Sequence, residues 1–285
     1  DISLQEHEPN GFTFNNDGTK MFAIGHKEDE VIEYTLSTAW DVSTACATGH
    51  CSTARDSFST FSTQSESGYS RDVKFSQDGT KMFVLGGSDS GADDGLDSVC
   101  EYTLSTGFDV SSTVTFIDCK SVSPVGFAEE LAFSPDGTKM FVLDNTGNDV
   151  NEFKLTTGFD ISTASYVQTF SVNTQEDTPT GLVFTYDGTK MFVTGWSGDD
   201  INEYTLSTAF DVSTASFVDS FYMTDGSYGI RETYPTSLAF SSDGSKLFTL
   251  GREWDEVQEW TLSCYYGVVN CIDPTSDKDD VASVE

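Results

Sequence analysis

Short apolar runs alternate with polar turns along most of this chain. Residues 181–207 are typical, because the apolar run GLVF (181–184) precedes the turn TYDG, and KMFVT (190–194) and INEYTLS (201–207) follow it. The runs are rich in Phe, Val, Tyr, Thr and Ile, and none keeps a period of 3.6 residues. Asp-Gly between two apolar runs is a strong hairpin signal. The pattern therefore predicts antiparallel β-strands and very little helix.

One phrase of this pattern occurs five times. YDGTKMFVTG (186–195) has the counterparts NDGTKMFAIG (16–25), QDGTKMFVLG (77–86), PDGTKMFVLD (135–144) and SDGSKLFTLG (242–251). Four copies continue into a segment such as DINEYTLSTAFDVSTASFVDSF (200–221), and the fifth has a shorter EVQEWTL (256–262). Each full copy predicts four strands, which in the fourth copy cover 181–184, 190–194, 201–207 and 216–221.

The repeat predicts the overall fold. Four antiparallel strands, repeated five times at intervals of 51 to 61 residues, are typical of a β-propeller. Runs such as MFV are apolar on both sides of a strand, so each sheet needs cover on both faces, and a ring of blades supplies that cover. We therefore predict an all-β protein that forms one five-bladed β-propeller of four-stranded antiparallel blades.

The blade boundaries follow from the repeat. The predicted blades cover residues 9–69, 70–127, 128–178, 179–234 and 235–271. The fifth copy diverges after its third strand, and ISLQ near the N-terminus parallels the end of a fourth strand. We expect residues 1–6 to be the outer strand of the last blade, which would close the ring. Residues 272–285 are polar, and we expect a C-terminal tail or linker there.

The cysteines are paired as near neighbours in the sequence. They are Cys46, Cys51, Cys100, Cys119, Cys264 and Cys271. We predict three local disulfides, 46–51, 100–119 and 264–271, because the second pair flanks two strands around a turn; reduced thiols are the alternative. Disulfides indicate an oxidising compartment, and DISLQ suits the start of a processed secreted protein, so we expect a secreted, extracellular or surface-displayed protein.

The charge is strongly negative. The chain has 14 basic and 47 acidic residues, a net charge of −33. A polyanion would be repelled, so nucleic acid is not an expected partner, and anionic membrane surfaces are disfavoured for the same reason. No apolar run has the roughly 18–20 residues of a transmembrane segment. The charge serves either solubility or the binding of cations by carboxylates.

The run FSPDGTKMFVLD (133–144) resembles the repeat of lactonase-like, YVTN-type β-propellers. With EYTLSTAFDVSTAS (203–216) attached, it is similar to repeats of large secreted or virion-associated proteins of aquatic microbes. The resemblance covers nearly the whole chain and implies a propeller blade, which occurs in enzymes, adhesins and scaffolds alike. Lactonase-like enzymes generally have more than five blades, and their catalytic carboxylates cannot be placed on this chain residue by residue.

The two faces of the predicted disc differ. One carries near-identical DGTK turns and aromatic-Asp turns, which indicates an architectural role, with a stacking face as the alternative. The other carries loops of varied length that hold about half of the carboxylates, and loops on a rigid scaffold usually hold binding residues. One such loop, SDSGADDGLD (88–97), predicts a candidate Ca²⁺ site, with a solvated acidic loop as the alternative. Its carboxylates are Asp89, Asp93, Asp94 and Asp97.

Two further groups on the variable face are candidate ligand-binding sites. The first group consists of charged residues at the start of the inner strands in the second and third blades: Arg71, Asp72, Glu129 and Glu130. They could form a catalytic acid/base set, a sugar-binding cluster or a salt-bridge plug in the channel. Aromatic residues and an arginine on the loops can hold sugar rings or pack between blades: Trp196, Arg252, Trp254 and Tyr234.

Charged residues that recur in every blade indicate structure. A Lys follows each DGT or DGS, and a Glu recurs in each third strand, so we interpret them as polar pairs that stitch the blades. No GxSxG, P-loop or Rossmann glycine pattern occurs, and we assign no catalytic residue.

The sequence as a whole favours a non-enzymatic extracellular module. It would bind glycan or protein through its acidic loop face, or self-associate into an appendage or filament. The alternative is a secreted hydrolase or lactonase-like enzyme that uses carboxylates at the channel mouth, with Ca²⁺ as the one cofactor considered.

Overall fold

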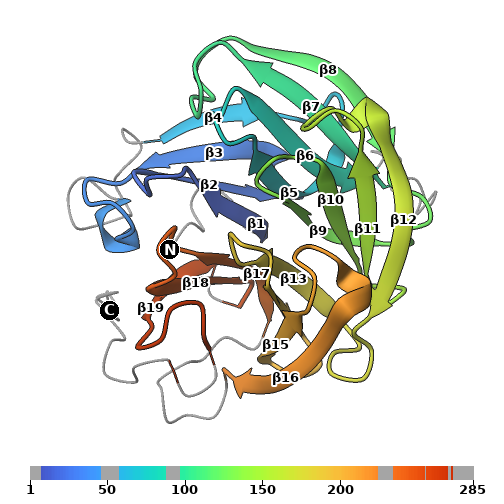
Figure 1. Ribbon diagram of the computed structural model, residues 1–285. Helices are drawn as coiled ribbons and strands as arrows, with labels where there is room; N and C mark the ends of the chain where they lie inside the picture. Colours follow the sequence, from blue (N-terminus) through green and yellow to red (C-terminus); the bar gives the residue numbers. More distant parts are fainter. Residues whose placement is uncertain are drawn as a thin grey trace.

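The computed structural model of the chain describes residues 8–45, 58–87, 97–223, 234–253, 255–268 and Cys271. These residues form five antiparallel sheets arranged around one axis, as Figure 1 shows. The helical turns that they include are short 3₁₀ segments, η1 (Val42–Ala45), η3 (Ile161–Thr163) and η4 (Val212–Thr214). The predicted all-β, five-bladed propeller is therefore confirmed. None of the helices in the described ranges has the length and apolar character that a membrane span requires.

The strands of each blade follow one another in chain order. The first blade contains β1 (Pro9–Phe14), β2 (Lys20–Gly25), β3 (Glu30–Thr35) and β4 (Phe58–Ser62). The second contains β5 (Gly68–Phe75), β6 (Lys81–Gly87), β7 (Ser98–Leu104) and β8 (Val114–Ser121). The third contains β9 (Ala128–Phe133), β10 (Lys139–Asp144), β11 (Asp149–Leu155) and β12 (Ala164–Ser171). The fourth contains β13 (Pro179–Phe184), β14 (Lys190–Gly195), β15 (Asp200–Leu206) and β16 (Ala215–Tyr222). The fifth contains β17 (Pro235–Phe240), β18 (Lys246–Gly251) and β19 (Glu256–Thr261).

The inner strands β1, β5, β9, β13 and β17 surround the axis (Figure 1). Each contacts the inner strands on both sides, and β17 contacts β1. Phe12 of the first blade and Phe248 of the last share one hydrophobic cluster. The ring is thus continuous within the described residues. The expected outer strand at residues 1–6 and the expected tail at 272–285 lie outside those residues, so both stay predictions.

The repeated Lys and Glu join neighbouring blades as well as neighbouring strands. In the third blade, the Lys139 ammonium binds Glu152 at 2.8 Å and donates to the Phe210 carbonyl of the fourth blade at 2.5 Å. The second oxygen of Glu152 accepts the Val212 N–H at 3.2 Å. We call this arrangement the blade clamp. Equivalent Lys–Glu pairs occur at Lys20–Glu33, Lys81–Glu101, Lys190–Glu203 and Lys246–Glu259.

Each Asp-Gly turn lies under an aromatic ring. Gly188 has a φ of 69°, and a Cβ added there would lie 2.2 Å from the Phe210 ring. Only glycine meets both requirements, because a side chain is disfavoured at positive φ and has no room. The same pairing occurs at Gly18–Trp40, Gly79–Phe108, Gly137–Phe159 and Gly244–Tyr266. The phrase recurs because every blade needs this turn and this clamp.

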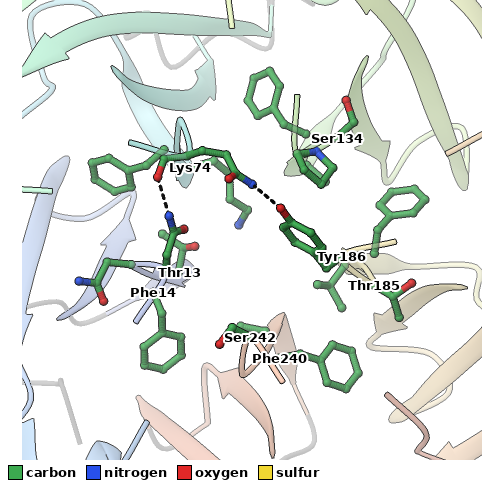
Figure 2. A pocket seen from close by; sticks show the side chains of 18 of the residues that line it. Thr13, Phe14, Lys74, Ser134, Thr185, Tyr186, Phe240 and Ser242 are labelled. Atoms are coloured by element: carbon green, nitrogen blue, oxygen red, sulfur yellow. Dashed lines mark hydrogen bonds between the residues drawn. The ribbon is translucent and has the colours of Figure 1, made fainter. Parts of the chain in front are cut away.

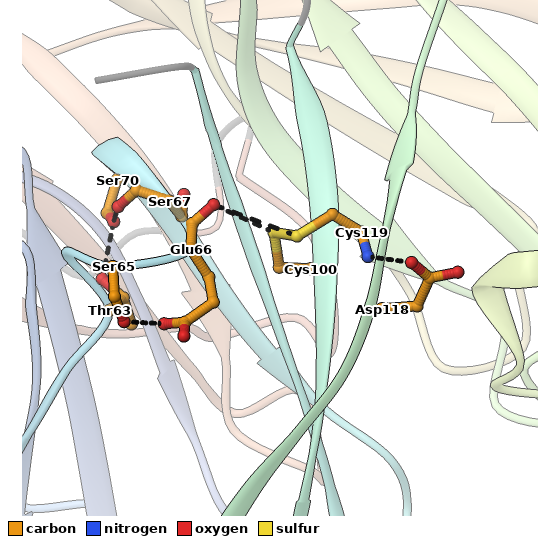
Figure 3. The surroundings of a disulfide bond; sticks show 8 residues. All are labelled: Thr63, Ser65, Glu66, Ser67, Ser70, Cys100, Asp118 and Cys119. Atoms are coloured by element: carbon orange, nitrogen blue, oxygen red, sulfur yellow. Dashed lines mark hydrogen bonds between the residues drawn. A yellow bond between two sulfur atoms is a disulfide. The ribbon is translucent and has the colours of Figure 1, made fainter. Parts of the chain in front are cut away.

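Two of the predicted disulfides are confirmed. Cys100 on β7 and Cys119 on β8 are directly opposite in the strand register and are bonded. Figure 3 shows this disulfide beside the carbonyl oxygen of Glu66, in the turn between β4 and β5. Cys264 and Cys271 form the second disulfide. The predicted 46–51 pair lies outside the described residues. The two confirmed disulfides are typical of a protein from an oxidising compartment.

Candidate functional site

The inner strands begin with a β-bulge at one end of the channel. The register with the second strand shifts at Asn10, Glu129, Thr180 and Thr236, and β5 is irregular around Tyr69 and Arg71. A bulge turns a side chain away from the regular alternation of the strand. We call this end of the disc the loop face, since the variable loops between the second and third strands lie here. The charged residues selected from the sequence start these strands.

Asp72 and Glu130 lie inside the channel and bind one lysine. Both carboxylates are fully buried, and the Lys74 ammonium lies 2.8 Å from Asp72 and 2.7 Å from Glu130. The Ser237 hydroxyl donates to Glu130 at 3.0 Å, and the Leu131 N–H donates to Asp72 at 2.9 Å. Burial raises the pKa of both carboxyls, and the two carboxyls interact with each other. These three charged side chains form a salt-bridged plug. Sequence reasoning missed Lys74, although it lies two residues after Asp72 and therefore on the same strand face.

Arg71 and Glu129 lie nearer the mouth of the channel. Arg71 donates to Asp97 at 2.9 Å and to the Ala128 carbonyl at 3.1 Å, and its guanidinium lies 3.9 Å from the Phe127 ring centroid. Glu129 is 9% exposed. Burial raises the pKa of Glu129 to about 7, although the Arg71 charge opposes this shift. The structure therefore divides the four residues that the sequence grouped together. Asp72 and Glu130 belong to the plug, and Arg71 and Glu129 lie at the mouth.

The Ca²⁺ prediction concerns the loop that ends at Asp97. In the structure Asp97 is salt-bridged to Arg71, and it also accepts the Ala128 N–H. The other three candidate ligands, Asp89, Asp93 and Asp94, lie outside the described residues. Within the described ranges, no group of three or more His, Cys, Asp or Glu residues is placed to hold a metal ion. Calcium binding stays a prediction.

The first loop residue after each second strand has a fixed backbone position and a variable side chain. The N–H groups of Asn145, Trp196 and Arg252 donate to the carbonyls of residues 127, 178 and 234 at 2.9, 3.1 and 3.1 Å. His26 follows β2 at the corresponding place. One scaffold position thus carries four different side chains on the loop face.

His26 and Arg252 meet across the interface between the first and last blades. The His26 Nε2 lies 2.7 Å from Glu8, and its Nδ1 lies 3.0 Å from the Arg252 guanidinium and 2.9 Å from the Asn10 side-chain oxygen. Burial, followed by the Arg252 charge, lowers the pKa of His26. A neutral imidazole with its proton on Nε2 donates to Glu8 and accepts from Arg252 through Nδ1, whereas the other tautomer donates through Nδ1 to the Asn10 oxygen. His26 was not singled out from the sequence because it belongs to no metal-ligand spacing.

The aromatic residues selected from the sequence meet at the same mouth. The rings of Trp196 and Tyr234 are perpendicular, with centroids 5.8 Å apart, and the Arg252 guanidinium lies 5.6 Å from the Trp196 centroid. Tyr234 is half exposed. The Trp196 indole N–H and the Arg252 Nε have no hydrogen-bond partner among the described residues. We call Trp196, Tyr234 and Arg252 the aromatic cluster; Trp254 lies outside the described residues.

A pocket of about 410 Å³ opens at the other end of the channel, among the Asp-Gly turns. Figure 2 shows Thr13, Lys74 and Tyr186 around it, from three different blades. We call this pocket the funnel. Sequence reasoning assigned its face an architectural role, since identical turns gave no sign that their ring encloses a cavity.

Three solved structures with a similar fold compare with this chain as follows. A functionally unknown protein from Desulfotomaculum acetoxidans is 14% identical, with a TM-score of 0.51 and with 90% of this chain and 66% of that chain covered. A luciferin-regenerating enzyme is 15% identical, with a TM-score of 0.52 and coverages of 86% and 84%. A periplasmic gluconolactonase from Pseudomonas aeruginosa is 18% identical, with a TM-score of 0.50 and coverages of 89% and 66%.

At these identities the similarity shows a shared fold, the β-propeller that lactonase-like proteins also have. This chain spans about two thirds of the length of the first and third of these structures. No protein-family profile and no curated protein sequence matches the chain.

Proposed function

We propose that this protein is a non-enzymatic extracellular module that binds glycan at the aromatic cluster of its loop face. The observation that supports the proposal is the convergence of Trp196, Tyr234 and Arg252 at the channel mouth. Sugar rings stack on exposed aromatic side chains, and polar groups beside the rings fix the sugar hydroxyls. Tyr234, which is half exposed, offers both an aromatic ring and a hydroxyl group of this kind.

The net charge narrows the glycan class. With a net charge of −33, the chain repels polyanions at ordinary ionic strength. Sulfated or uronic polysaccharides are therefore disfavoured, and the proposed ligands are neutral oligosaccharides.

The test is binding to a panel of neutral and acidic oligosaccharides, with two variants. Trp196→Ala removes the stacking surface and should weaken binding at least about tenfold, since such anchors contribute on the order of 2 kcal/mol. Tyr186→Ala is the matched control, because Tyr186 is 64% exposed and lies on the opposite face. Binding that survives Trp196→Ala, or that is lost equally in both variants, would contradict the proposal.

A hydrolase is the second candidate, and Glu129 is the observation that favours it. A carboxyl with a pKa of about 7 at a channel mouth suits a general acid or base. The test is hydrolysis of simple lactones and esters by the wild type and by Glu129→Gln. Hydrolysis that this substitution abolishes would support an enzyme, whereas no hydrolysis by the wild type would leave glycan binding as the function.

A further inference from the structure

The wall of the funnel is aromatic in every blade. The ends of the inner strands contribute Phe14, Phe75, Phe133, Phe184 and Phe240. The turns between third and fourth strands, with their counterpart after β19, contribute Trp40, Phe108, Phe159, Phe210 and Tyr266. The volume of about 410 Å³ lies within the range of small-molecule sites. The funnel can therefore enclose the apolar body of a small ligand, and it is separate from the loop-face cluster.

The floor of the funnel does not attract an anion. Among the described residues that line it, Lys74 alone is charged. Its ammonium already donates to Asp72, to Glu130 and, at 3.4 Å, to the Phe12 carbonyl, so its three N–H groups are used. The two carboxylates behind it also oppose its charge. A carboxylate or phosphate on a ligand would therefore find no unpaired ammonium and no net positive field at the floor.

Each blade carries one exposed carboxylate in the Asp-Gly turn beside the funnel, next to the lining residues but not itself part of the lining. These are Asp17, Asp78, Asp136, Asp187 and Asp243, all exposed, and the residue before each of them lines the funnel. The Thr185 hydroxyl, followed by the Thr189 N–H, holds the pKa of Asp187 below its usual value, and the other four carboxyls are held down in the same way. The nearby Lys190 is paired with Glu203 in the blade clamp, so it does not neutralise Asp187.

We propose that the funnel binds a small organic cation. The apolar body of the ligand contacts the aromatic wall, and its ammonium group faces the funnel mouth, where the neighbouring turns carry the five exposed carboxylates. An anionic ligand is disfavoured at both ends of the funnel. At the floor, the Lys74 ammonium is already paired with two carboxylates, and at the mouth the nearby carboxylates would repel a negative charge. The aromatic wall favours a cation with an apolar body over a hydrated inorganic ion such as Na⁺, which gains nothing from contact with aromatic rings.

The first test uses three probes with one body and different charges: 3-phenylpropylammonium, 3-phenylpropan-1-ol and 3-phenylpropanoate. Calorimetric titration of the wild-type chain should give the highest affinity for the ammonium probe and no measurable affinity for the carboxylate. The advantage of the ammonium over the alcohol should shrink in 1 M salt, where screening acts within about 3 Å. Equal affinities for the ammonium and the alcohol, tighter binding of the carboxylate, or no binding of the ammonium at 10 mM would overturn the proposal.

The second test locates the site. Asp17→Asn with Asp187→Asn removes two of these turn charges and keeps a side-chain oxygen that can accept the turn hydrogen bonds. It should weaken binding of the ammonium probe by about threefold, since exposed charge pairs contribute little to binding. Asp118→Asn with Asp219→Asn changes the net charge equally on outer strands β8 and β16, and it should leave the affinity unchanged. Equal effects of the two pairs would show that only the overall charge matters and would overturn the site. Thermal melting of all variants checks that each is folded.

Discussion

The ammonium of Lys246, in the last blade, donates a 2.6 Å hydrogen bond to the carbonyl oxygen of Trp40, in the first blade. Lys246 also binds Glu259 at 2.5 Å, and Glu259 accepts the Val42 N–H at 3.2 Å. This is the same blade clamp that joins the third and fourth blades through Lys139. The interface that closes the ring is therefore built like an interface inside the ring.

Removal of this clamp should open the ring at its seam. Lys246→Met leaves Glu259 nearly buried without its cation, which should lower the free energy of unfolding by about 2–4 kcal/mol. Lys139→Met should cost a similar amount, whereas Lys154→Met, at an exposed position on β11, should change it by less than about 0.5 kcal/mol. Urea unfolding of the three variants measures this. A large cost for Lys139→Met with none for Lys246→Met would show that the seam is held by other contacts.

The close contact between Gly188 and the Phe210 ring predicts that a side chain at position 188 will destabilise the fold. Gly188→Ala adds a methyl at a φ of 69° and against the Phe210 ring, so we expect a loss of about 2–4 kcal/mol. In a Phe210→Ala background the ring is gone and the added methyl has room, so its cost should fall to about 1–2 kcal/mol, the backbone part. A double-mutant cycle by chemical denaturation measures the difference. Additive costs would contradict a direct contact between the two residues.

Glu129 should make stability depend on pH. Its pKa is raised from 4.5 to about 7 in the folded protein, so the folded state favours the protonated carboxyl. The penalty for its ionisation is absent below about pH 4.5 and is complete above about pH 7. Glu129→Gln should therefore raise the free energy of unfolding by about 2–3 kcal/mol at pH 8 and leave it unchanged at pH 4. The gain is measured by urea unfolding at both pH values. Equal gains at both would show that Glu129 is destabilising for reasons other than charge.

The two described disulfides should contribute unequally. Their cysteines are 19 and 7 residues apart in the sequence, and a longer closed loop restricts the unfolded chain more. Cys100→Ser with Cys119→Ser should cost about 3 kcal/mol, and Cys264→Ser with Cys271→Ser about 2 kcal/mol. Guanidinium unfolding of the two double variants gives the comparison. A larger cost for the shorter loop would indicate that native packing around Tyr266, rather than the unfolded chain, sets the contribution.

The sequence alone determined the features that depend on short-range pattern. Short runs rich in β-branched and aromatic residues, with Asp-Gly turns between them, predicted the strands, and the fourth copy lies at β13 to β16 within two residues of its predicted limits. The repeat predicted the number of blades and the stitching role of the Lys–Glu pairs, and the cysteine spacing predicted the two confirmed disulfides. Each of these follows from neighbours along the chain or across one hairpin, so local periodicity and turn chemistry were sufficient.

Only the tertiary structure decided which charged residues meet around the axis. Lys74 binds Glu130 from 56 positions away, and Ser237 reaches the same carboxylate from 107 positions away. Contacts between residues that are distant in the sequence also pair Arg71 with Asp97, bury Glu129 and form the wall of the funnel. These contacts depend on how five sheets pack about one axis, since the angle between blades sets the width of the channel. No local sequence pattern encodes that angle, because it results from the packing of whole blades against each other.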